Sequence, residues 1–98
     1  MPLHNPYDGE VVHNPEASRF EIQIERQVAV LRYQMRGGTI LFTHTGVPRE
    51  LEGRWLGTRL VHTGLEYARE QGLKVDSLCW FVDRYISKHP EYADLMDS

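Results

Sequence analysis

Residues 51–58 carry the residue types that bind phosphate groups. Gly53 and Gly57 flank Arg54, and Thr58 follows at the start of a stretch with helical periodicity. A loop that runs from a strand directly into a helix presents unpaired backbone N–H groups and the positive end of the helix dipole at one place. Arginine and threonine side chains can add hydrogen bonds there. The loop therefore suits a phosphate, although an ordinary strand-to-helix turn can have the same composition.

Two further side chains could take part in covalent or proton-transfer chemistry. Cys79 is the only cysteine, and it is either a nucleophile in its thiolate form or a small buried apolar residue. His44 is either a neutral base at working pH, since an unperturbed imidazole has a pKa near ~6.5, or a sheet histidine with satisfied hydrogen bonds. The five histidines are too scattered to join Cys79 in a zinc site, so we expect no metal.

The elements that must position these residues begin with strands. Alternating apolar and polar side chains predict one strand over Arg19–Glu25 and a second over Val28–Arg36. Gly37 and Gly38 then predict a hairpin turn. Thr39–Val47 is rich in β-branched and aromatic residues on both faces, which predicts a strand at the centre of the sheet that is covered on both sides.

A helix must follow the glycine loop. Apolar residues recur at steps of three and four from Leu56 to Ala68, and Gly72 is a natural left-handed cap, so the pattern predicts an amphipathic helix that ends there. Leu73–Phe81 is predicted to be a strand and Val82–Lys88 a short second helix ended by Pro90. A strand, a helix and a strand imply a parallel pair with a right-handed crossover. The expected fold class is thus α+β, an antiparallel meander leading into a parallel β-α-β unit.

The ends of the chain give less information. Residues 1–17 lack periodicity and contain Asn-Pro turns, so we expect a loop or an edge strand there. At the other end, Tyr92, Leu95 and Met96 are expected to dock the acidic tail, and Trp80, Phe81 and Tyr92 are expected in the core. All of these residues have large, mostly apolar side chains, so burial is the expected role of each.

Length and composition exclude several classes of protein. The chain has 98 residues, 41% hydrophobic and 26% charged, which fits one compact soluble domain over residues 1–98. A formal net charge of -3 argues against nucleic acid as the main partner, and the sequence contains no apolar run long enough to span a membrane. The N-terminus lacks the pattern of a secretory signal, so we expect the protein in a reducing cytoplasm.

Taken together, these elements resemble the GNAT superfamily of N-acetyltransferases, and especially its minimal single-domain, GCN5-like members. The resemblance spans about Ser18 to Asp94 and rests on residues 37–48, 51–61 and 78–92. It implies a GNAT core with splayed central strands over residues 18–94. It also implies that acetyl-CoA lies between the two splayed parallel strands, with its pantetheine against the end of the first strand and its pyrophosphate on the loop.

The cofactor-binding residues that the resemblance implies are the strand end and the loop: Thr45, Gly46, Val47, Glu52, Gly53, Arg54, Trp55, Leu56, Gly57 and Thr58. The family loop has Gln or Arg first, Gly three residues later and Gly or Ala two residues after that. Glu52 and Trp55 depart from this pattern at the first two of these positions, whereas Gly57 fits the last. The backbone carries most of the phosphate contact, so Glu52 matters less. The Trp55 ring either weakens cofactor binding or stacks on the cofactor.

The resemblance also implies three candidate catalytic residues. Cys79, placed near the end of the second splayed strand, is similar to a cysteine of the small family members and would take the acetyl group or lie beside the cofactor sulfur. His44 would accept a proton from the incoming ammonium. Tyr85 lies near the position of a tyrosine that protonates the departing thiolate in larger relatives, or else it belongs to a packed helix face with Ile86 and His89.

The leading hypothesis is an acetyl-CoA-dependent N-acetyltransferase that acts on an amine of a protein, peptide or small molecule, such as a polyamine attracted by the acidic charge. A second hypothesis is a non-catalytic acyl-CoA-binding or protein-interaction module on the same fold. A third treats the loop as a turn and Cys79 as packing, with no response to coenzyme A. An unpaired sheet edge could support a weak homodimer, so we expect a monomer or such a dimer.

Overall fold

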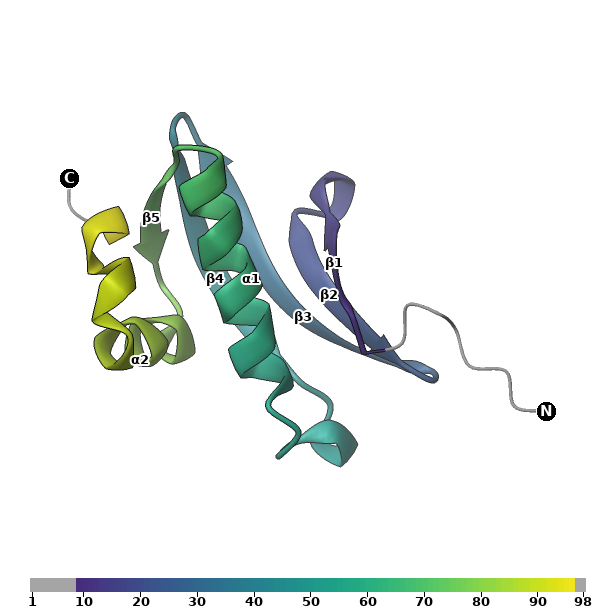
Figure 1. Cartoon of the computed structure of the whole chain (residues 1–98). Helices are drawn as coiled ribbons and strands as arrows, with labels where there is room; N and C mark the ends of the chain where they lie inside the picture. The colour runs from purple at the N-terminus through teal and green to yellow at the C-terminus, as the bar shows by residue number, and fades with distance from the viewer. Residues whose placement is uncertain (1–8, 97–98) are drawn as a thin grey trace.

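The computed structural model describes residues 9–96, in which five strands form one sheet (Figure 1). The strands lie in the order in which they follow one another in the chain: β1 (Val11–Asn14), β2 (Arg19–Ile24), β3 (Gln27–Arg36), β4 (Thr39–Gly46) and β5 (Lys74–Ser77). The helices are α1 (Leu56–Glu70) and α2 (Trp80–Lys88), with three short 3-10 segments: η1 (Pro15–Ala17), η2 (Arg49–Leu51) and η3 (Pro90–Met96). Of the expected N-terminal loop or edge strand, residues 1–8 lie outside the described residues, and β1 forms one edge of the sheet.

The first four strands form the predicted antiparallel meander. Alternation explains it: Phe20 and Ile22 of β2 are buried, whereas the side chains between and beside them are more exposed. Gly37 adopts a φ of +61° in the β3–β4 turn, a conformation that glycine reaches without steric cost. The predicted strands and hairpin are therefore confirmed.

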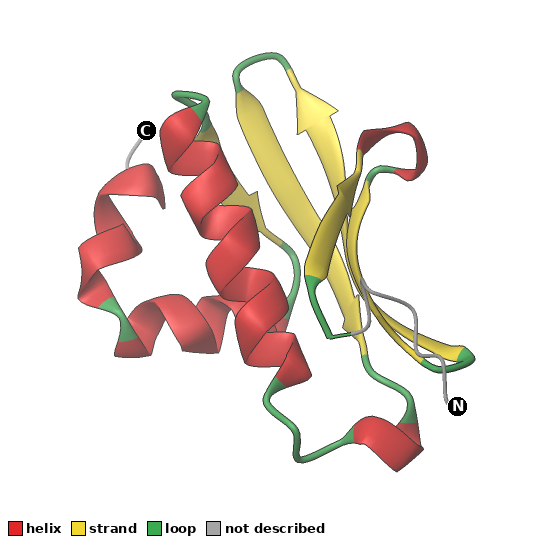
Figure 2. Ribbon diagram, turned by 45° about the vertical axis from the view of Figure 1, so that its right-hand side comes forward, coloured by secondary structure: helices red, strands yellow, loops and turns green. Residues whose placement is uncertain are grey.

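Two expectations about β4 are wrong. The central strand is β3, because β1 adds a fifth strand on the far side of the meander and β4 lies between β3 and β5. The helices all pack on one face of the sheet (Figure 2), toward which Ile40 and Phe42 point. Leu41 alternates to the other face and is buried there without a covering helix (Figure 2). Three consecutive buried residues thus did not mean two covered faces.

Helix α1 begins at Leu56 and has the predicted buried stripe, and it ends at Glu70, two residues before Gly72. Gly64 brings the helix against the sheet, because a Cβ at this position would lie 3.0 Å from Leu31 and 3.1 Å from the Phe42 ring. Gly72 follows the helix with a φ of +69°, as expected for a left-handed cap. None of the helices within residues 9–96 is long and apolar enough to cross a bilayer.

The predicted strand over Leu73–Phe81 is wrong beyond Ser77. β5 pairs in parallel with β4 from Thr39↔Lys74 to Phe42↔Ser77, and α2 already begins at Trp80. The apolar run after Ser77 resembles a strand in composition, but it has no strand to pair with. Trp80 is 70% exposed, which contradicts its assignment to the core, whereas Phe81 packs partly buried against the core.

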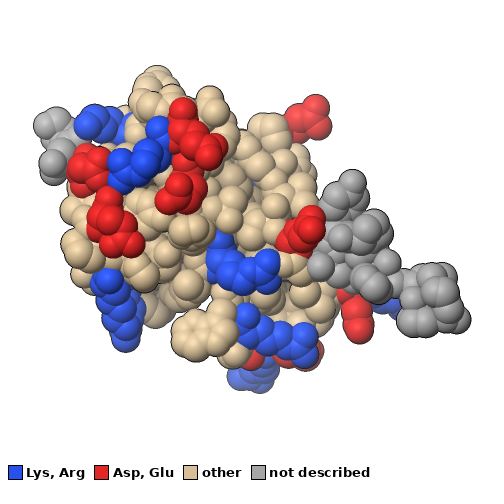
Figure 3. Space-filling view, in the orientation of Figure 1, with Lys and Arg blue, Asp and Glu red and all other residues tan. Residues whose placement is uncertain are grey.

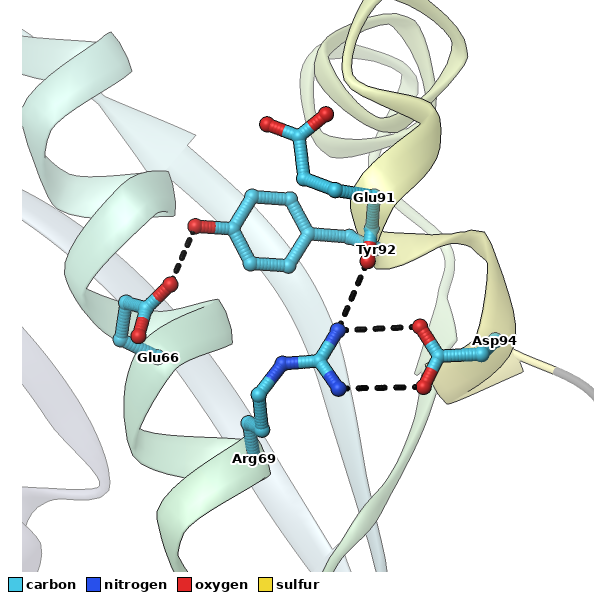
Figure 4. Close-up of polar contacts among 5 residues, drawn as sticks. All are labelled: Glu66, Arg69, Glu91, Tyr92 and Asp94. Atoms are coloured by element: carbon cyan, nitrogen blue, oxygen red, sulfur yellow. Dashed lines mark hydrogen bonds and ion pairs between the residues drawn. The ribbon is translucent and has the colours of Figure 1, made fainter.

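The C-terminal segment η3 is held against α1 by a polar network (Figure 4). The Arg69 guanidinium donates two hydrogen bonds to the Asp94 carboxylate and one to the Glu91 carbonyl, and it lies over the Tyr92 ring. The Tyr92 hydroxyl donates to Glu66 at 2.5 Å. Tyr92 is buried as expected, and so is Leu95 of the same segment, while Met96 is more exposed, at 37%.

Candidate functional site

A cavity of about 690 Å³ opens where β4 and β5 separate. The last link between these strands is the hydrogen bond from the Leu78 N–H to the Phe42 carbonyl, at 2.9 Å. Beyond it, Thr43 is an extra residue in β4, because Arg32 pairs with His44 and Tyr33 pairs with Phe42. This bulge and the start of α2 leave the β5 side of residues 43–46 without a strand partner among the described residues. The predicted splay is therefore present, and it forms one wall of the cavity.

The opposite wall is the loop and first turn of α1. Of the ten residues expected to bind cofactor, all except Arg54 line this cavity. The first intrahelical hydrogen bond runs from the Arg59 N–H to the Trp55 carbonyl at 3.0 Å. Within residues 9–96, the N–H groups of Leu56, Gly57 and Thr58 have no backbone acceptor, and the first turn contains no acidic residue. The helix therefore presents free donors and the positive end of its dipole to the cavity.

Basic side chains surround this end of the molecule. Figure 3 shows Lys and Arg side chains gathered where η2 lies and α1 begins, and the arginines of these segments are Arg49, Arg54 and Arg59. Glu50 and Glu52 lie in the same stretch of chain, so the local charge is mixed. The positive end of the α1 dipole is therefore the main source of positive potential at the cavity. An arginine near the cavity can add a charge-assisted hydrogen bond to an anion that binds there.

Gly57 makes the helix start fit against α2. A Cβ at this position would lie 3.0 Å from the Phe81 ring and 3.7 Å from Thr45. Only glycine allows this approach without moving the aromatic ring. The glycine at the last position of the family loop thus sets the distance between the two helices at the cavity.

Trp55 occupies the loop position where the family has glycine, and it keeps a glycine-like backbone. Its φ of 63° and ψ of 20° are left-handed, and its side chain is 75% exposed. The ring does not fill the cavity. The departure from the family pattern therefore leaves the space between the strands open.

Cys79 lies two residues past the end of β5, at the N-cap of α2, rather than within a strand as expected. Its side chain is 8% exposed, and its sulfur lies 3.4 Å from the Thr45 hydroxyl. Ser77 holds the turn around it, because its hydroxyl accepts from the Cys79 N–H and donates to the Cys79 carbonyl. The thiol thus bridges the separated strands at the inner end of the cavity.

His44 and Cys79 lie on different faces of the sheet. His44 pairs opposite Arg32, and its ring lies near Gly46 on the face without helices. Thr45, the partner of the Cys79 thiol, pairs opposite Leu31 on the helix-covered face. The structure therefore places a base candidate and a thiol on either side of β4.

Tyr85 lies outside this cavity. It lines a second, smaller hollow that is bordered by the start of β1, by α1 and by Tyr85 itself, with its hydroxyl 3.4 Å from His62 Nδ1 and its ring stacked on His89 at 4.1 Å. Burial, and then the charges of Glu91 and Glu66, raise the pKa of the Tyr85 hydroxyl. The alternative reading of Tyr85 as part of a packed helix face describes its position more closely.

Sequence reasoning missed the polar network that surrounds Tyr85. The Tyr92 hydroxyl lies 3.1 Å from His62 Nδ1 and donates to Glu66, so the His62 N–H is the donor in the pair with Tyr92. Burial, followed by the Glu66 hydrogen bond, raises the pKa of Tyr92 well above its ordinary range. His62 and Glu66 are one helical turn apart, which was the only sequence signal. In the described part of the chain, no cluster of His, Cys, Asp and Glu is placed to hold a metal ion.

The meander, the separated parallel strands and the helix that starts at their cavity define a GNAT-like fold. Residues 19–95 match the family model described as GCN5-related N-acetyl-transferase. The chain belongs to this family.

Relatives and a solved structure agree with this assignment. The chain is 28% identical over 89 residues to protein NATD1 of Danio rerio, which covers 86% of this chain and 81% of that protein. It is 29% identical over 83 residues to protein NATD1 of Homo sapiens, covering 82% and 74% respectively. The solution structure of a GCN5-like N-acetyltransferase candidate from Staphylococcus aureus superposes with a TM-score of 0.70 at 29% identity, covering 88% of this chain and 85% of that one.

Proposed function

We propose that the protein is an acetyl-CoA-dependent N-acetyltransferase that modifies an amine of a protein, peptide or small molecule. The observation that carries the proposal is the cavity between the diverging ends of β4 and β5, which also borders the free start of α1. Its volume of about 690 Å³ lies within the roughly 300–1,000 Å³ of small-molecule and cofactor sites. Family membership supports the same activity.

The residues around the cavity fit coenzyme A. The N–H groups of Leu56, Gly57 and Thr58 suit the pyrophosphate, since free helix-terminal donors bind anions. The backbone of residues 43–46 lacks a strand partner on its β5 side, so its polar groups suit the amide groups of the pantetheine arm. An apolar inner end, closed by Leu51, Leu56 and Cys79, suits the thioester.

Acetyl-CoA supplies an activated acetyl group as a thioester. On the acceptor side, His44 lies on the sheet face without helices, where an incoming amine has access, and a neutral imidazole there takes the ammonium proton. Cys79 and Thr45 bound the inner end of the cavity, where the thiol and hydroxyl position the reacting carbonyl. Tyr85 does not line this cavity, so it has no contact with the thioester in this mechanism.

Calorimetric titration with acetyl-CoA, followed by assay of coenzyme A release with peptide amines and polyamines, tests the proposal. Saturable binding and amine-dependent release support it, and the absence of binding at millimolar acetyl-CoA would contradict it. Binding without release for any amine would favour an acyl-CoA-binding module instead.

Variants separate the roles of the two candidate residues. Cys79→Ser should retain measurable transfer if the amine attacks directly, whereas loss of transfer together with an acetylated Cys79 in the wild type, detected by mass spectrometry, would show a covalent route. His44→Gln should lower the rate most in the pH range in which an imidazole is neutral while the acceptor amine is still protonated, and least at low pH, where an imidazole cannot accept a proton. A pH–rate profile identical to that of the wild type would remove His44 from the mechanism.

A further inference from the structure

Trp55 has a side chain that the fold does not use. Its indole is 75% exposed, and it has no aromatic partner among the described residues. Burial therefore does not explain why a large aromatic ring stands at this position. A substitution that removes the ring would cost the core nothing.

The backbone of Trp55 makes the ring harder to explain by stability. A φ of 63° is strained for a residue with a Cβ, and Gly53, two residues earlier, meets a similar demand with glycine. Residues held in such conformations concentrate at ligand sites, where the conformation aims a side chain. The strained backbone at Trp55 is therefore typical of a residue whose side chain contacts a ligand.

The ring faces the candidate coenzyme site beside its phosphate end. Trp55 lines the cavity and directly precedes the three free N–H groups of α1. In coenzyme A, the purine base is joined to the pyrophosphate through a single ribose, so a base whose phosphates lie on this turn falls within reach of the residue before it. Flat aromatic side chains bind nucleobases by stacking.

We infer that the indole of Trp55 is the stacking surface for the purine base of the coenzyme, an inference that rests on the proposed function. Trp80 is the competing aromatic residue, because it also lines the cavity and is 70% exposed. However, Trp80 packs edge-on against Phe81, at 6.0 Å between ring centroids, and its backbone is ordinary helix. Only Trp55 combines a free ring, a strained backbone and adjacency to the phosphate donors.

The test compares coenzyme A with 4′-phosphopantetheine, which lacks the purine, the ribose with its phosphate and one phosphate of the pyrophosphate, by calorimetry on the wild type and three variants. Trp55→Phe keeps a flat ring. Trp55→Gly and Trp55→Asn both tolerate the left-handed backbone and remove the ring. We expect the Gly and Asn variants to bind coenzyme A about tenfold more weakly, the effect of one lost base stack, and the Phe variant to stay close to the wild type. Binding of 4′-phosphopantetheine should be equal in all four proteins.

Fluorescence gives an independent readout, because the chain has only two tryptophans. In a Trp80→Phe background, coenzyme A should quench the emission of Trp55 and 4′-phosphopantetheine should not. Unchanged or tighter coenzyme A binding in the Gly and Asn variants would overturn the stacking inference while leaving the proposed function intact. If the wild type binds neither ligand, the proposed function fails as well.

Discussion

The strain at Trp55 predicts that replacing it with glycine stabilises the protein. A left-handed conformation costs a residue with a Cβ about 1–2 kcal/mol, and glycine removes this cost. Glycine also makes the unfolded chain more flexible, which offsets about 0.4–1 kcal/mol. The exposed ring contributes little burial to lose. The net expected gain is about 0.5–1 kcal/mol, or roughly 2–8 °C in Tm for a domain of this size.

Thermal unfolding without ligand measures this gain, and Trp55→Ala is the matched control. Alanine removes the ring but keeps the Cβ, so it keeps the strain and should show no increase in Tm. A glycine variant no more stable than the alanine variant would refute the reasoning, because it would show that the backbone at this position is not strained. With coenzyme A present, the stability advantage of the glycine variant over the wild type should shrink or reverse, because ligand binding adds RT ln(1 + [L]/Kd) and the wild type is expected to bind more tightly.

Three further predictions concern Gly57 in the cavity wall, the Tyr92 hydroxyl that donates to Glu66, and His13 of β1, whose Nε2 lies 2.6 Å from the Tyr33 hydroxyl. Gly57→Ala should push the Phe81 ring, weaken acetyl-CoA binding and lower stability by about 1–2 kcal/mol, with Gly38→Ala as a control because a Cβ at Gly38 meets nothing within 4 Å. Tyr92→Phe should cost about 1–2 kcal/mol in urea unfolding. Since the raised pKa of Tyr92 makes stability fall as pH rises above 10, this variant should also lose less stability in alkali. Burial lowers the pKa of His13 below 6.5, so stability should fall as the pH drops through 6.5, and His13→Phe should flatten that part of the curve. Equal pH dependence in variant and wild type would contradict either assignment.

Most of the fold could be predicted because its elements bury one face each. The period of two in β2 and β3, and the steps of three and four in α1, record which side chains face the core, and the structure follows them closely. The failure at Leu78–Phe81 has the opposite cause. The composition of this segment favours a strand, but a strand needs a hydrogen-bonded neighbour. The bulge at Thr43 turns β4 away from this segment, so β4 cannot be that neighbour. Local sequence does not report the loss of a pairing partner.

The candidate site also has one part that local sequence predicts and another part that it does not predict. The cavity-lining loop could be predicted, because a glycine-containing segment before an amphipathic helix is a local pattern. The separation of His44 from Cys79 across the sheet could not, because the bulge shifts the register by one residue and reverses which side chains share a face. The pairing of Tyr92 with Glu66, 26 residues apart, depends on how η3 folds back over α1.

The early end of the β4–β5 pairing, at Ser77, is also what forms the cavity. A parallel strand that continued past Ser77 would satisfy the backbone of residues 43–46 and close the space between the strands. Ending the pairing instead leaves polar groups that a ligand with amides can satisfy, next to a helix start that a phosphate can satisfy. The two unsatisfied sets are linked through η2 and the loop that contains Trp55. A ligand that bridges both sets of groups should therefore hold this loop in place. The left-handed backbone at Trp55 lowers the stability of the free protein, and binding of such a ligand offsets this cost.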